Sequence, residues 1–132
     1  MKIYRGHPGP PESTVTVHEG GTTRPLYRPA VGDLGYGWGD GGMLATRLAL
    51  ALAGDVLDDD HEATKIYQRL KHRTVRLWPA DQPWMITEAD LKAQIEDIRK
   101  VERETAQMRA MVAREPAPVV NEGGLGIGGK TP

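Results

Sequence analysis

Alternating and β-branched segments in the first quarter of the chain predict short strands. Residues 2–5 form one such segment, and residues 14–18 form a second in which apolar and polar positions alternate. After a glycine turn, residues 23–27 can return as a third strand, which Pro25 confines to a sheet edge. Residues 74–78 alternate again and predict a last strand.

A central helix is predicted over residues 42–53, which are apolar almost all round. A helix without a polar face cannot lie on a surface, so this one must run through the core. We expect Leu48 and Leu52 to be buried there, and we expect the helix to end at Gly54.

Two further helices follow an acidic connector at residues 55–60. The second starts near His61, because apolar residues then recur at helical spacing. Thr87 caps the third, which can run to about Arg114.

Strands followed by helices on one sheet face define an α+β fold. We predict a small antiparallel or mixed sheet packed on the central apolar helix, with a long C-terminal helix and a flexible tail. Residues 1–98 form the compact domain, residues 99–115 a projecting helical extension, and residues 116–132 a Pro- and Gly-rich tail.

The glycine-rich loop before the central helix forms a structural motif. Trp38 should pack back onto the domain, and Gly39 or Gly41 should have a positive φ, which glycine adopts without steric cost. Gly42 then opens the helix.

Several segments resemble a small family of uncharacterised domains found in bacterial and phage genomes, over roughly residues 1–98. The segments that carry the resemblance are Lys2–Gly6, Trp38–Gly42, Leu48–Leu52, Tyr67–Lys71 and Trp84–Thr87. This chain departs from the family at Asp40 (Tyr in the family), at residues 43–45 (Ser-Gly-Pro) and at Leu70 (Phe). The resemblance implies a fold and a bacterial or phage context, and no activity.

Composition narrows the class of protein. The net charge is −1, so no global field attracts polyanions, and without cysteine there is no disulfide framework or thiolate metal site. We expect no signal peptide, because Lys2 and Arg5 are followed by turn residues, and the apolar runs are far shorter than a membrane span. We expect no membrane partner and a location in the cytoplasm of a bacterial host, with a place in a virion left open.

Motifs that suggest chemistry lack the context which that chemistry needs. Residues 124–131 match a P-loop without a following helix, and residues 37–42 match a dinucleotide fingerprint without a preceding buried strand. Asp60 and Glu62, in an acidic cluster, are explained as helix cap and first-turn charge. We predict no catalytic, cofactor or metal residues, and no enzyme.

A basic stretch in the second helix and the strand after it is the best candidate for nucleic-acid contact. It consists of Lys65, Arg69, Lys71, Arg73 and Arg76. The alternative interpretation is a solvated protein face.

The third helix carries a stronger interaction signal. Heptad a positions fall on Leu91, Ile98, Thr105 and Val112, and d positions on Val101 and Met108. Met111 suits an adaptable contact, so we assign partner binding to Val101, Met108, Met111 and Val112.

The sequence therefore predicts a non-enzymatic protein-interaction or accessory module, bacterial or phage-borne, that engages a protein partner or forms a homodimer through residues 99–114. One alternative is a nucleic-acid-binding protein that uses residues 65–76, and another is a minor virion component.

Overall fold

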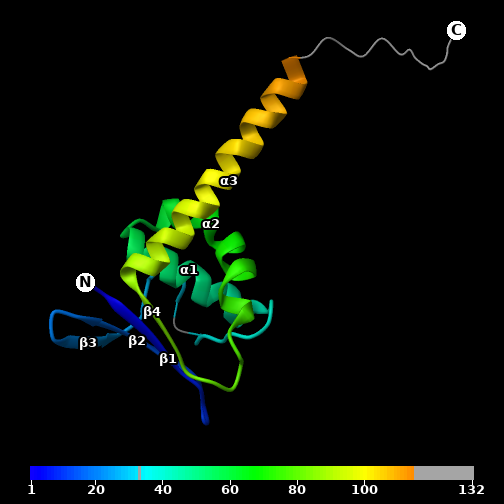
Figure 1. Ribbon diagram of the computed structural model, residues 1–132. Coiled ribbons are helices and arrows are strands. Elements are labelled where there is room, and N and C mark those ends of the chain that lie inside the picture. The colour runs from blue at the N-terminus through cyan, green and yellow to red at the C-terminus, as the bar shows by residue number, and fades with distance from the viewer. Residues whose placement is uncertain (33, 115–132) are drawn as a thin grey trace, which may run out of the picture. The chain divides into compact units, whose positions relative to one another are not determined.

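The computed structural model describes residues 1–32 and 34–114 (Figure 1). The chain divides into two compact units, residues 1–99 and residues 100–132. Helix α3, Glu88–Arg114, contributes residues to both. The fold is α+β, as predicted; the predicted tail and the P-loop match lie outside the described residues.

Within the described part of the first unit, four antiparallel strands form one sheet in the order β3-β2-β1-β4. The strands are β1 (Ile3–His7), β2 (Thr14–Glu19), β3 (Thr22–Pro25) and β4 (Trp84–Thr87). β1 lies between β2 and β4, with Tyr4 opposite Val17 on one side and Ile86 on the other. These three side chains are buried, whereas Arg5 and Met85, one position along, are exposed. One sheet face therefore covers the core, and the helices of this unit lie on that side (Figure 1).

Helix α1 spans Met43–Leu57 and runs through the core, with Leu48 and Leu52 fully buried as predicted. It does not end at Gly54. Asp58, in the left-handed conformation at φ 51°, terminates it instead. Glycine at position 54 allows the backbone of α1 to approach Asp60 closely, because a Cβ atom there would lie 2.6 Å from the Asp60 carboxylate.

Helix α2, Asp60–Arg73, begins one residue before the predicted start. Its N-cap is Asp59, whose carboxylate accepts a hydrogen bond from the Glu62 N–H at 3.0 Å. The predicted cap, Asp60, pairs with Arg28 at 2.9 Å. The predicted acidic connector is therefore reduced to Asp58 and Asp59, because Asp55 belongs to α1.

The predicted strand over residues 74–78 is wrong. Val75–Leu77 form a short 3-10 helix, η1, in which Val75 is buried and Leu77 is exposed. The place beside β1 is taken by β4, immediately before α3. Thr87 caps α3 as predicted, since its hydroxyl accepts a hydrogen bond from the Asp90 N–H at 3.1 Å.

Candidate functional site

The glycine-rich loop is held by the three tryptophans of the chain. Trp38 is buried, and its indole N–H donates to the carbonyls of Pro79 and Gln82, each at 3.1 Å. Its ring meets Trp84 edge-on at 5.7 Å, and Trp78 stacks on Trp84 at 4.2 Å. The loop thus packs back onto the domain, as predicted, against the segment that leads into β4.

Gly39 is the loop position that requires glycine. Its φ is +89°, and a Cβ atom there would lie 2.6 Å from the Cβ atom of Ala80. The prediction of a positive φ at Gly39 or Gly41 is confirmed at Gly39, whereas Gly41 faces open space. The N–H groups of Gly37, Gly39 and Gly42 all donate within the protein, so they do not form an open cradle for a phosphate.

A buried carboxylate that sequence reasoning missed ties the sheet to α1. Asp55 accepts hydrogen bonds from the Tyr4 hydroxyl at 2.7 Å and the Arg24 guanidinium at 2.9 Å, and the Lys2 ammonium lies at 3.3 Å. Burial by itself would raise the pKa of Asp55, but the bonds from Tyr4 and Arg24 and the charge of Lys2 bring it below its usual value. Burial and the Asp55 carboxylate raise the pKa of Tyr4.

One signal pointed to Asp55. It follows Leu48 and Leu52 by seven and three residues and therefore falls on the buried side of α1. An acidic residue on such a side has to find partners inside the protein. Its partners are a phenol and two cations, and the arrangement is a structural ion-pair network between β1, β3 and α1.

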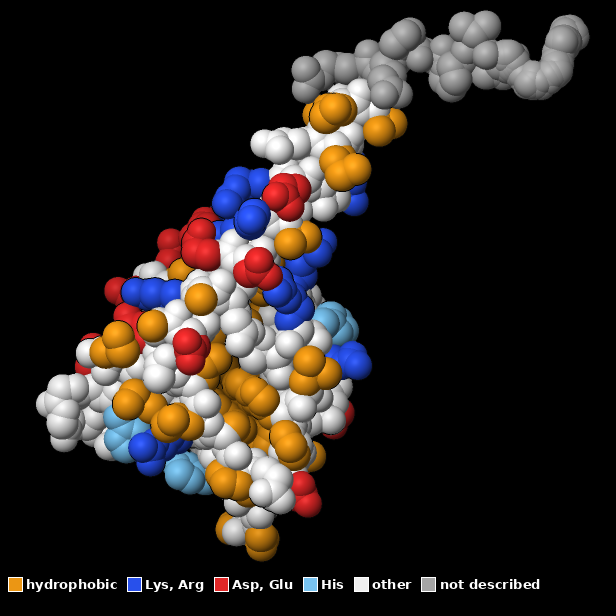
Figure 2. Space-filling view, in the orientation of Figure 1, with side chains coloured by type: hydrophobic (Ala, Val, Ile, Leu, Met, Phe, Trp, Pro, Cys, Tyr) orange, Lys and Arg blue, Asp and Glu red, His pale blue; other side chains and the backbone are white. Residues whose placement is uncertain are grey.

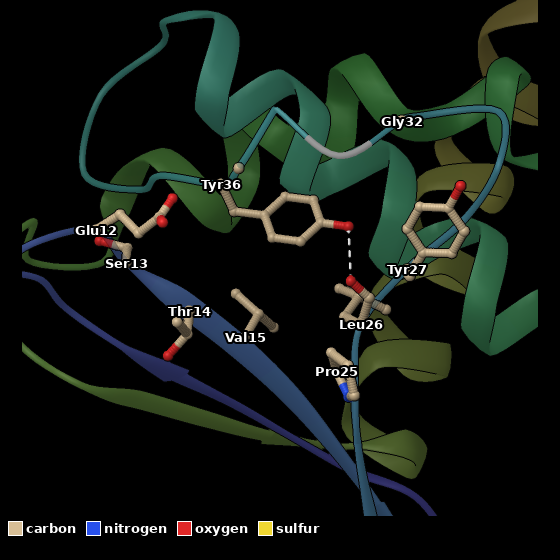
Figure 3. A pocket seen from close by; sticks show the side chains of 10 residues that line it. Glu12, Ser13, Thr14, Val15, Pro25, Leu26, Tyr27, Gly32 and Tyr36 are labelled. Atoms are coloured by element: carbon tan, nitrogen blue, oxygen red, sulfur yellow. Dashed lines mark hydrogen bonds between the residues drawn. The ribbon is translucent and has the colours of Figure 1, made fainter.

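A hollow of about 330 Å³ lies between the ends of β2 and β3 and the loop before α1 (Figure 3). Its walls are mostly apolar, from Val15, Pro25, Leu26 and the rings of Tyr27 and Tyr36. The Tyr36 hydroxyl donates to the Leu26 carbonyl at 2.9 Å, which fixes one wall. No local sequence pattern indicates this hollow, because its walls come from separate segments. Its shape and lining suit a small apolar group.

Of the five predicted nucleic-acid residues, four are exposed and Lys71 is not. Lys71 is buried, and its ammonium group donates to the Thr46 hydroxyl at 3.0 Å and the Gly41 carbonyl at 3.4 Å. Lys65 pairs with Glu62 at 2.8 Å, and Arg73 pairs with Asp97. Arg69 and Arg76 are exposed. Lys71 therefore supports the glycine-rich loop from α2 and is withdrawn from the predicted interface.

The predicted partner-binding residues are exposed along a helical segment. α3 continues through Val112, and the exposed fractions of the side chains at Val101, Met108, Met111 and Val112 are 41%, 67%, 63% and 67%. Thr105 lies between them, and its hydroxyl donates to the Val101 carbonyl at 2.9 Å. In the first unit the same helix buries Leu91, Ile95 and Ile98.

Searches for metal-ligand groups and for membrane-spanning helices cover the part of the chain that the structure describes. No group of three or more His, Cys, Asp or Glu side chains is placed to hold a metal ion among residues 1–32 and 34–114. No described helix is both long enough and apolar enough to cross a bilayer.

These features define a class: a small α+β domain in which a four-stranded antiparallel sheet, within the described residues, covers an apolar helix on one face only. The chain belongs to DUF6166, a family of unknown function, whose model matches residues 4–97. No curated protein and no solved structure matches it.

Proposed function

We propose that this protein is a non-enzymatic interaction module, bacterial or phage-borne and acting in the host cytoplasm, that engages a protein partner or a second copy of itself through residues 99–114. One observation carries the proposal: the row of exposed apolar side chains on α3 at Val101, Met108, Met111 and Val112. Water disfavours such a row, and exposed apolar patches of this kind mark interaction surfaces.

The spacing of the row supports a helical partner. Residues 101, 105, 108 and 112 recur at intervals of four and three, which places them on one stripe of the helix. Glu102, Glu104 and Arg109 flank the stripe and can set the orientation of a partner helix. Fully burying an exposed Val or Met side chain contributes roughly 1.5–3 kcal/mol, so the three apolar side chains of the stripe, Val101, Met108 and Val112, can support a specific contact.

The test is a pair of double variants of the full chain. Met108→Glu with Val112→Glu places two charges on the stripe, whereas Ala106→Glu with Gln107→Glu places the same two charges off it. Sedimentation at rising concentration reports self-association, and co-purification from a bacterial host reports another partner. We expect the first variant to lose the association and the second to keep it. A wild-type chain that stays monomeric and retains no partner contradicts the proposal, as does equal loss in both variants.

A further inference from the structure

The sheet face turned away from the core is a second surface with a distinct chemistry, here called the outer face. It carries the side chains that alternate with the buried ones, including Arg5 and His7 of β1, His18 of β2 and Met85 of β4. Most of its remaining side chains are threonines of β2, β3 and β4. An antiparallel sheet commonly keeps one solvated face, so exposure alone indicates nothing. The kind of side chain on this face is what calls for an explanation.

The outer face carries no acidic side chain from the four described strands. Its ionisable side chains are Arg5, His7 and His18, and Glu19, the one acidic residue in the four described strands, alternates to the other side with Val17. The side chains of Arg5 and His7 make no hydrogen bond or ion pair with any other described residue. His18 uses Nδ1 with the Thr23 hydroxyl at 2.8 Å, which leaves its Nε2 atom available. Figure 2 shows histidine and basic side chains side by side at this sheet, among hydrophobic ones.

The register places these three groups in a row. Arg5 and His7 are two residues apart on one strand, so they lie about 7 Å apart on the same face. Arg5 lies opposite Thr16, and His18 follows two residues along β2, a diagonal of about 7–8 Å. Three planar, nitrogen-bearing side chains thus follow one another at a nearly even spacing across two strands.

A hollow of about 340 Å³ adjoins the row, and Arg5, Gly6, His7, Pro83, Trp84 and Met85 line it. Its β1 side is basic and its β4 side is apolar, through Pro83 and Met85. A ligand that fits both the basic and the apolar side of the hollow contains an anionic group attached to a flat apolar group. A nucleotide unit of a nucleic-acid strand has this composition, with a phosphate for the basic side and a base for the apolar side.

We propose that the outer face binds single-stranded nucleic acid, with Arg5, His7 and His18 as the contacting row. Arginine and histidine planes stack on unpaired bases and contact phosphates, and threonine hydroxyls donate to phosphate oxygens. A sheet face offers no helix or ribbon for the major groove of a duplex, whereas it is open to the splayed bases of a single strand. The site is separate in sequence from the α2 residues singled out above.

The experiment measures binding of the full chain to a fluorescent oligo-dT and an oligo-U of 12 nucleotides, at three salt concentrations. Arg5→Gln with His7→Gln removes two members of the row. The matched control, Arg103→Gln with His61→Gln, makes the same two replacements at exposed positions of α3 and α2 that belong to neither candidate nucleic-acid surface. We expect the first variant to weaken binding at least tenfold and to reduce the salt dependence by about one phosphate contact or more. The control should change binding less than twofold, and both variants should keep the wild-type melting temperature.

Three results would overturn the proposal. The wild-type chain fails to bind either oligonucleotide at 50 mM salt; the control variant weakens binding as much as the outer-face variant; or a duplex of the same sequence binds as tightly as the single strand. Polyglutamate of equal charge serves as a competitor. If it displaces the oligonucleotide at equal charge concentration, the face recognises acidic protein segments and the nucleic-acid assignment is wrong.

Discussion

Replacing Asp55 by alanine tests how much the buried ion-pair network contributes to the free energy of unfolding. The carboxylate is 4% exposed, and it binds the Tyr4 hydroxyl, the Arg24 guanidinium and the Lys2 ammonium. The substitution leaves the Tyr4 and Arg24 donors without their acceptor, whereas the Lys2 ammonium keeps the Asp55 backbone carbonyl at 3.3 Å. The three donors differ in their exposure to water, and this exposure determines how much free energy of unfolding the substitution removes.

Tyr4 carries the larger part of that cost. Its side chain is fully buried, so its hydroxyl loses a partner without access to water, which costs about 1–3 kcal/mol. Arg24 is 43% exposed and Lys2 is 18% exposed, so both cations can turn toward solvent. Removing one partner of a fully buried ion pair costs about 3–5 kcal/mol, and this partial exposure places Asp55→Ala near the lower end, about 3 kcal/mol.

Urea unfolding followed by tryptophan fluorescence gives the free energy of unfolding, because Trp38 and Trp84 lie in the core. Asp58→Asn serves as control, since its side chain is 92% exposed and asparagine tolerates the left-handed φ of 51°, and it should change stability by less than about 0.5 kcal/mol. Tyr4→Phe combined with Asp55→Ala should cost less than the sum of the two single changes, because the phenylalanine leaves no hydroxyl to satisfy. If Asp55→Ala matches the Asp58 control, the network does not stabilise the fold and the reasoning is refuted.

Three further predictions concern pH, the core and the glycine-rich loop. The pKa of Asp55 is lowered in the folded protein, so the stabilisation by its carboxylate is fully present above the ordinary pKa of 3.8 and is lost as the pH falls below that value. In urea titrations, the wild type should therefore lose more stability between pH 5 and pH 3 than Asp55→Asn does. Leu48→Ala should cost about 2–5 kcal/mol in the same assay, and a cost below 1 kcal/mol would contradict its central place. Gly39→Ala should cost at least about 2 kcal/mol from its positive φ and the contact with Ala80, against about 0.5 kcal/mol or less for Gly41→Ala; melting temperatures that fall equally would show that the loop does not require Gly39.

The local sequence pattern was enough to predict the structure wherever short-range interactions select the backbone conformation. β-branched alternation located β2, and a run of small and apolar residues located α1 with Leu48 and Leu52 in its buried part. Thr87 was readable as a cap because its hydroxyl satisfies a backbone N–H only three residues away. These features depend on neighbours in the chain, so a single sequence contains the information.

The tertiary structure decided the features that depend on distant neighbours. Residues 74–78 alternate like a strand, yet β4 occupies the place beside β1, and a sheet edge accepts one neighbour. Gly54 resembles a helix stop, but the close approach of Asp60 accounts for it. Asp55 and Lys71 are charged residues that sequence pattern assigns to a connector and to a surface, and each is buried because its partners come from other elements. Charge predicts exposure only until partners across the fold replace water, and the sequence by itself does not show where those partners lie.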